Sequence, residues 1–204
     1  MAYFVKGRKS VNEIDKKFSV RKITVIGLLA ALTVVMGSLG IGFIPLPMAK
    51  ATIMHLPVII GAIIEGPVVG MIIGLIFGLF SIFQNMQQPT WLSPALINPL
   101  VSVLPRVCIA VTSYYTYKAL RGKNTFLAAG SAAAIGTLTN TVGVLGISCL
   151  LFVAGSVIPA DKTLDAALAT LGTICVTNAI PELIVSVVVC VPVVGALLKM
   201  YKKK

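Results

Sequence analysis

The stretch MHLPVIIGAIIEGPVVG, residues 54–70, decides the fold of this chain. It joins two uncharged apolar runs, 52–64 and 68–84, which are separated only by Glu65-Gly66-Pro67. Proline is favoured in the first turn of a helix, so we expect Pro67 to open the second of two helices. The stretch therefore predicts a tight helical hairpin, of a kind typical of helices that lie in a membrane.

The whole chain has the same apolar character. Its 204 residues are 57% hydrophobic and only 11% charged, too few polar residues to cover the surface of a soluble domain. The sequence predicts an all-α integral membrane protein, a single bundle of six transmembrane helices with no separate soluble domain. Pro181 and Pro192 are expected to kink the last helix, and Pro45 and Pro47 favour extended backbone in the loop 40–51. The predicted spans are 23–40, 52–64, 68–84, 94–117, 126–153 and 166–198.

The basic residues predict the orientation. Fourteen of the 17 Lys and Arg lie in the two terminal segments or between the fourth and fifth spans, and only Lys50 and Lys162 fall on the opposite side. Cytoplasmic loops hold the excess of positive charge, so we expect both termini in the cytoplasm of a multi-pass plasma-membrane protein. Positive charge gathered at span ends does not suit a nucleic-acid partner. The chain is thereby divided into a basic cytoplasmic segment 1–22, a membrane domain 23–199 and a basic cytoplasmic tail 200–204.

Arg106 is the most informative polar residue inside a predicted span. An arginine deep in a membrane helix costs about 2.5–3.5 kcal/mol on insertion scales, and persists when it is paired, solvated or functional. Counted along its span from Pro94, it lies near the middle of the bilayer. Two interpretations stay open: the guanidinium binds a carboxylate or phosphate of a substrate, or it pairs with Glu182, a second deep charge.

Asn140 and Asn178 are expected at a depth similar to that of Arg106, each in a different span. Their amides can hydrogen-bond the hydroxyl and amide groups of a ligand, or they can join helices inside the bundle. Together the three side chains predict a ligand cup that opens outward.

The predicted outer loops and the second span add further candidates. Residues 84–94 form an amide-rich loop with the single tryptophan, Trp91, which either anchors the chain at the membrane interface or closes over a ligand. His55, one turn into the second span, is interpreted first as an interfacial or capping residue and second as a substrate contact. Asn85 and Asn98 complete the set of candidate substrate-binding residues.

The sequence contains none of the motifs that would indicate an enzyme. It has no Ser/His/Asp set, no HExxH, no paired carboxylate site and no phosphate-cradling glycine loop. The four cysteines stand singly in apolar runs and are interpreted as small buried hydrophobic residues. We therefore expect neither catalysis nor a metal or other cofactor in this chain.

Small residues recur at every fourth position. Gly70, Gly74 and Gly78 in the third span let another helix approach closely, and we expect them to pack inside the bundle. Gly27 and Ala31 repeat this spacing in the first span, where the face can serve internal packing or dock a partner protein.

Three segments carry a family resemblance. Residues 54–70, followed by Gly74 and Gly78, resemble the second and third spans of the substrate-binding S components of energy-coupling factor (ECF) vitamin transporters. Residues 98–106 and 136–142 extend the resemblance to later spans. The Pro-Arg and Thr-Asn-Thr motifs within them are most similar to those of the pantothenate-specific members.

The resemblance implies a six-helix subunit that binds one vitamin near its outward face. Such a subunit joins a transmembrane coupling subunit and two cytoplasmic ATPases, which use the ATP. In that family small residues of the first span contact the coupling subunit, and the matching positions here are Gly27 and Ala31 or the adjacent Ala30, with glycine where alanine is usual. The first and third outer loops act as lids in that family.

The identity of the substrate stays open at this point. Pantothenate has a carboxylate, hydroxyls and an amide, which suit Arg106 and Asn140. The alternatives are an S component for riboflavin, a pyridoxine-like vitamin, a thiamine precursor or folate, or a self-sufficient secondary transporter. For the last of these, Glu182 alone is thin support for an ion relay.

Overall fold

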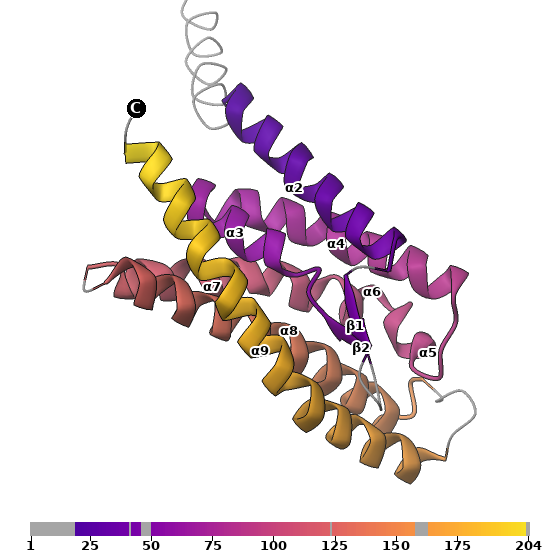
Figure 1. Cartoon of the computed structure of the whole chain (residues 1–204). Helices are drawn as coiled ribbons and strands as arrows, with labels where there is room; N and C mark the ends of the chain where they lie inside the picture. The colour runs from indigo at the N-terminus through magenta and orange to yellow at the C-terminus, as the bar shows by residue number, and fades with distance from the viewer. Residues whose placement is uncertain (1–18, 41, 46–49, 123, 158–162, 203–204) are drawn as a thin grey trace, which may run out of the picture.

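A computed structural model describes residues 19–40, 42–45, 50–122, 124–157 and 163–202, and it shows a helical bundle (Figure 1). Two short antiparallel strands connect α2 to α3, and two short helices precede α7. The elements are α2 (Val20–Ser38), β1 (Phe43–Pro45), β2 (Lys50–Thr52), α3 (Leu56–Glu65), α4 (Pro67–Gln87), α5 (Ser93–Leu96), α6 (Pro99–Ser102), α7 (Leu104–Leu120), α8 (Thr125–Val153) and α9 (Leu164–Lys202).

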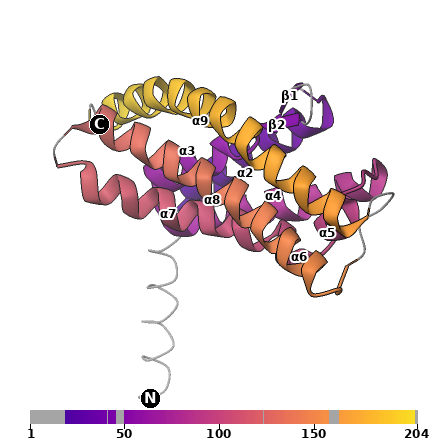
Figure 2. The same ribbon diagram turned by 90° about the horizontal axis from the view of Figure 1, so that it is seen from below.

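Helix α3 is the buried centre of the bundle. It contacts α2, α4, α7, α8 and α9, and every residue from Leu56 to Ile63 is buried. The other long helices follow one another around it, because α2 packs on α4, α4 on α7, α7 on α8 and α8 on α9. Figure 2 shows α7, α8 and α9 in this succession, and α9 curves along the edge of the bundle. Helix α2 begins and α9 ends at the same end of the bundle (Figure 1).

The predicted hairpin in residues 54–70 is confirmed. Helix α3 ends at Glu65, Gly66 has a φ of 103°, and Pro67 is the first residue of α4. Only glycine adopts such a φ without steric cost, which explains the sharp reversal. The guanidinium of Arg21 lies 3.2 Å from the Glu65 carboxylate and fastens the start of α2 to this turn.

The glycines of α4 allow its backbone to touch α6 and α7. A Cβ built on Gly74 would collide with the carbonyl of Arg106, and one on Gly78 would lie 2.7 Å from the Ser102 carbonyl oxygen. A Cβ on Gly70 would crowd Ala62 and Ala110. The prediction that this stripe packs inside the bundle is therefore confirmed, and the contact fixes the position of Arg106.

Four helices among the described residues, α2, α4, α8 and α9, are long and apolar enough to cross a membrane. Helices α3 and α7 are shorter than these four, with 10 and 17 residues. Large aliphatic side chains cover the outside of the bundle, among them Leu28, Leu150 and Val176, each more than 60% exposed. A surface of this kind suits lipid rather than water.

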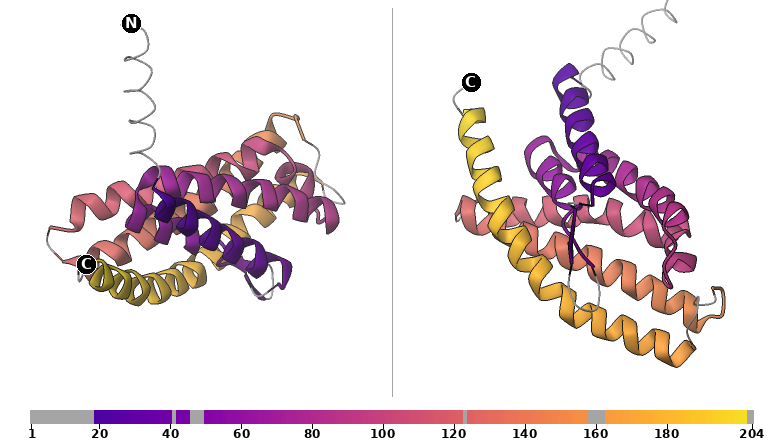
Figure 3. Two further views of the ribbon diagram at one scale, coloured as in Figure 1. Left: turned by 90° about the horizontal axis from the view of Figure 1, so that it is seen from above. Right: turned by 45° about the vertical axis from the view of Figure 1, so that its right-hand side comes forward.

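One sequence-based expectation about the helices needs correction. The predicted continuous span 94–117 is divided into α5, α6 and α7. Asn98 caps α6 and its side chain accepts a hydrogen bond from the Leu100 N–H at 2.9 Å, while Pro99 restricts the residue before it, so the chain turns there instead of continuing as one helix. The extended backbone expected at Pro45 is confirmed, because Pro45 ends strand β1, which pairs with β2 in an antiparallel arrangement with Phe43 opposite Thr52. Figure 3 shows this hairpin between the α2 side and the α8–α9 side of the bundle.

The two prolines at which the last helix was expected to kink do not interrupt it. Helix α9 continues through Pro181 and Pro192 from Leu164 to Lys202. Several expectations fall outside the described residues: those on most of the basic N-terminal segment, on Pro47, on Lys123 and Lys162, and on the last two lysines.

Gly74→Ala is expected to destabilise the protein by about 1–3 kcal/mol, because the new methyl group would push α4 away from the Arg106 backbone. Thermal melting of the purified protein in detergent measures this effect. Gly146→Ala is the matched control, since nothing lies within 4 Å of a Cβ there, and it should leave stability equal or slightly higher. Equal melting temperatures for the two variants would contradict the packing described.

Candidate ligand-binding site

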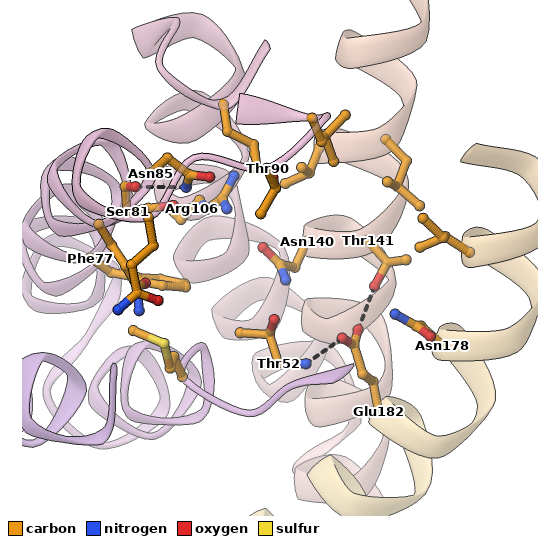
Figure 4. A pocket seen from close by; sticks show the side chains of 18 of the residues that line it. Thr52, Phe77, Ser81, Asn85, Thr90, Arg106, Asn140, Thr141, Asn178 and Glu182 are labelled. Carbon is orange, nitrogen blue, oxygen red and sulfur yellow. Dashed lines mark hydrogen bonds between the residues drawn. The ribbon is translucent and has the colours of Figure 1, made fainter. Parts of the chain in front are cut away.

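A cavity of about 380 Å³ lies at the end of the bundle that carries the β1–β2 hairpin and α5. Its volume is within the range of small-molecule sites, about 300–1,000 Å³. Side chains from α4, α7, α8, α9 and the loop after α4 meet in it (Figure 4). The lining residues are Thr52, Met54, Phe77, Ser81, Gln84, Asn85, Gln88, Thr90, Trp91, Leu92, Leu96, Arg106, Asn140, Thr141, Val144, Leu145, Ile174, Asn178 and Glu182.

Arg106 lines this cavity from the first turns of α7. Its Nη1 donates a hydrogen bond to the Val101 carbonyl oxygen at 2.8 Å, and its guanidinium carbon lies 5.4 Å from the centre of the Phe77 ring. The backbone bond and the cation–π contact hold the side chain in one orientation. Its Nε is buried and has no hydrogen-bond partner among the described residues. The guanidinium therefore has donor capacity left for a ligand.

Glu182 also lines the cavity, from the middle of α9. Its Oε1 accepts the backbone N–H of Thr52 at 2.6 Å, and its Oε2 accepts the Thr141 hydroxyl at 2.8 Å. Within the described part of the chain, no ion pair joins it to Arg106. The geometry therefore does not favour the structural pair that the sequence left open, and it leaves both charges facing the cavity (Figure 4).

Asn140 and Asn178 line the same cavity as Arg106, as the depth argument predicted. Both are buried, and the Oδ1 atom of each has no hydrogen-bond partner among the described residues. A buried amide oxygen without a partner costs about 1–3 kcal/mol, and a ligand donor would remove this cost. The two asparagines are thus available for a ligand, and neither bonds the other across the bundle.

Trp91 and Asn85 belong to the wall nearest the end of α4. Trp91 is half-buried against a small apolar cluster that includes Phe152 and Leu171. The Asn85 side chain donates to the Ser81 carbonyl oxygen at 2.8 Å and accepts from the Ser93 hydroxyl at 3.1 Å. Asn85 therefore shapes the cavity by tying α4 to the first residue of α5, and both Trp91 and Asn85 border the space where a ligand would lie.

Two candidates lie outside the cavity lining. His55 is fully buried at the start of α3, and its Nε2 lies 2.9 Å from the Thr137 hydroxyl and 3.1 Å from that of Ser186. Its hydrogen bonds join α3 to α8 and α9, which is a structural role rather than a substrate contact. Asn98 is likewise occupied, since its side chain caps α6.

The sequence singled out the amide-rich segment 84–94 but not Phe77 and Ser81, which continue its cavity-lining face along α4. Phe77, Ser81, Gln84 and Gln88 recur at helical spacing and all line the cavity, so the periodicity of this span held a usable signal. The Thr52 contact had no such signal, because it depends on where the β2 strand meets α9.

The small residues of α2 divide between two environments. Gly27 and Ala31 are exposed, and nothing lies within 4 Å of a Cβ on Gly27. Ala30 is only 6% exposed, because it faces the inside of the bundle. Ala30 is therefore not available to a partner, which corrects its inclusion among the docking positions.

An apolar helical bundle with a half-open cavity that contains several polar side chains suits a membrane protein that binds a small molecule. The match to a family model gives this class a name. Residues 21–194 match the model of "ECF transporter, substrate-specific component", and the chain belongs to this family. It is a transport subunit and not an enzyme.

One curated relative is similar over nearly the whole chain. The Pantothenic acid transporter PanT of Lactococcus lactis subsp. cremoris (strain MG1363) is 34% identical, over 90% of this chain and 97% of the relative. The family match over residues 21–194 includes all the residues that line the cavity, from Thr52 to Glu182.

His55→Ala is expected to lower the free energy of unfolding by about 1–3 kcal/mol, since it leaves two buried hydroxyls without their shared partner. Ligand affinity of the folded protein should change less than about threefold, a difference below 1 kcal/mol. Thermal melting and calorimetric titration measure the two quantities separately. A large loss of affinity at unchanged stability would restore the histidine to the binding site.

Proposed function

We propose that this chain is the pantothenate-binding S component of an ECF transporter. The observation that carries this proposal is the Arg106 guanidinium in the cavity wall, with a buried Nε that has no partner among the described residues. A guanidinium in such a place is matched to a carboxylate, which it can bind through two parallel hydrogen bonds. The relative that is named a pantothenic acid transporter supports pantothenate as the carboxylate ligand.

The remaining polar groups suit the rest of this vitamin. Pantothenate carries its carboxylate at one end, two hydroxyls at the other and an amide between them. Asn140 and Asn178 offer amide groups, and Thr141 and Glu182 offer oxygen atoms on the side away from Arg106 (Figure 4). Met54, Val144, Leu145 and Ile174 supply apolar wall for the methyl groups.

The other hypotheses receive less support. A different vitamin would leave the similarity to a pantothenic acid transporter without an explanation. A self-sufficient secondary transporter does not suit a chain that belongs to the family of ECF substrate-specific components. We therefore keep pantothenate as the substrate and expect no cofactor in this chain.

The proposed orientation has six spans, α2, α3, α4, α7, α8 and α9, with both termini in the cytoplasm. The start of α2, the α3–α4 turn, the α7–α8 link and the end of α9 gather at one end of the bundle (Figure 1). Lys118, Arg121 and Lys199 belong to these segments, and the positive-inside rule assigns that end to the cytoplasm. The cavity then opens toward the outside of the plasma membrane.

Docking to a coupling subunit is proposed for the outer face of α2. Gly27 and Ala31 leave a shallow strip on this helix between exposed Ile23, Leu28 and Val35. Small residues four apart allow two membrane helices to approach closely. Family membership implies such a partner, together with two ATPase subunits that hydrolyse ATP in the cytoplasm.

Arg106→Ala is expected to weaken pantothenate binding by about 10- to 150-fold, since a hydrogen bond to a charged group contributes about 1.5–3 kcal/mol. Isothermal titration calorimetry on the purified protein measures the dissociation constant. Arg121→Ala removes an exposed arginine of the α7–α8 link and should bind as tightly as the unmodified protein. Unchanged affinity in a stably folded Arg106→Ala variant would contradict the carboxylate assignment.

Gly27→Leu is expected to preserve pantothenate binding and to abolish co-purification with the coupling subunit and ATP-dependent uptake. The leucine would fill the open strip on α2 without touching the cavity. Gly172→Leu places the same side chain at another open glycine, on α9, and should assemble and transport normally. Normal assembly of the Gly27→Leu variant would argue against this docking face.

A further inference from the structure

The two sides of the cavity are chemically opposite. Figure 4 shows Arg106 beside Asn85 and Ser81 on one side, and Glu182 with Asn178 on the other. One side thus carries a cation and the other an anion. No ion pair among the described residues cancels the two charges. A ligand in this space meets a field directed from the Arg106 side toward the Glu182 side.

The anionic side is held in place by neutral donors. Glu182 is only 4% exposed, and its two oxygens accept the Thr52 N–H and the Thr141 hydroxyl. A carboxylate has room for about four accepted hydrogen bonds, so each oxygen keeps capacity for one more. Two neutral donors offset only part of the cost of burying the charge. Further donors from a ligand would lower that cost.

Neighbouring amides also offer hydrogen-bond acceptors. Asn178 precedes Glu182 by one helical turn on α9, so the two side chains lie on the same face. The Oδ1 atoms of Asn178 and Asn140 are buried and unpartnered among the described residues. This side of the cavity is therefore rich in acceptors and suits a group that donates hydrogen bonds and carries no negative charge.

We infer that Glu182 determines specificity: it accepts hydrogen bonds from the hydroxyl end of the ligand and rejects ligands that carry an anion at that end. The inference rests on the proposed function, which names pantothenate as the ligand. With the carboxylate bound at Arg106, the hydroxyl end of pantothenate reaches the Glu182 side. The opposite orientation would bring two carboxylates together and is excluded by their repulsion.

The consequence concerns the phosphorylated form of the vitamin. A phosphate on the terminal hydroxyl would replace a donor with a group of about −1.5 to −2 charge and only acceptor oxygens facing Glu182. The free vitamin is accordingly bound, and the phosphorylated vitamin is rejected. Glu182, rather than Arg106, makes this distinction, because the carboxylate end is the same in both molecules.

The test compares two ligands and two forms of the protein. Calorimetric titration of the purified full-length protein gives dissociation constants for pantothenate and for pantothenate phosphorylated on its terminal hydroxyl. The unmodified protein should prefer the free vitamin by about 100-fold or more, and Glu182→Gln should reduce this ratio at least about tenfold, or 1.4 kcal/mol. Glutamine keeps the size of the side chain and one oxygen for the Thr52 N–H, so the variant removes mainly the charge.

Two further variants separate charge in the cavity from charge elsewhere. Asp165→Asn removes an exposed acid from the first turn of the same helix and should leave the ratio unchanged. Asn178→Asp adds a negative charge beside Glu182 and should raise the ratio. Melting temperatures show whether each variant is folded. If Glu182→Gln does not fold, the ratio of the two dissociation constants in the Asn178→Asp variant provides the test.

The outcomes are distinguishable. Tight binding of the phosphorylated vitamin by the unmodified protein, or an unchanged ratio in a folded Glu182→Gln variant, would overturn the inference and leave the proposed function intact. If Glu182→Gln does not fold, an unchanged ratio in the Asn178→Asp variant would overturn it as well. A purified protein that does not bind pantothenate at all would overturn both.

Discussion

The close contact between the backbones of α4 and α7 is the constraint on which the binding site depends. Gly74 lies against the carbonyl of Arg106, and Gly78 lies against Ser102 and Val103 one turn away. No other residue type leaves room for this approach. It places Phe77 of α4 under the guanidinium, and the face of α4 that follows it becomes one wall of the cavity. The Arg106 guanidinium is thus held by the Phe77 ring and the Val101 carbonyl, and its Nε remains without a hydrogen-bond partner among the described residues.

The opposite wall depends on polar contacts between α8 and α9. Thr141 with Glu182 and Thr137 with Ser186 form two successive rungs, one helical turn apart on each helix. The Thr137–Ser186 pair also bonds His55 at the start of α3, and the Thr141–Glu182 pair also bonds Thr52 of the β2 strand. These bonds fix the angle of α9 in surroundings where hydrophobic contacts alone discriminate poorly between helix positions. The bond between Thr52 and Glu182 also holds the β1–β2 hairpin at the edge of the cavity.

The sequence predicted the fold well where local chemistry decides it. The α3–α4 hairpin follows from Gly66 and Pro67, and the long α4, α8 and α9 follow from uninterrupted apolar runs. It was wrong where capping and proline interrupt an apolar run, as at Asn98 and Pro99. Of the candidate site, Arg106, Asn140, Asn178, Trp91 and Asn85 share one cavity, whereas His55 and Asn98 are engaged elsewhere.

The sequence by itself determined the class of the protein, because composition and the spacing of glycine and proline act within a few turns of one helix. It also identified the buried arginine, since a charge in an apolar run has few physical explanations. Only the tertiary structure decided that Arg106 and Glu182 face a shared space without pairing, and that Ala30 points inward while Gly27 points out. Those facts depend on how each helix is rotated and where distant segments meet, and helix packing across the whole bundle fixes both.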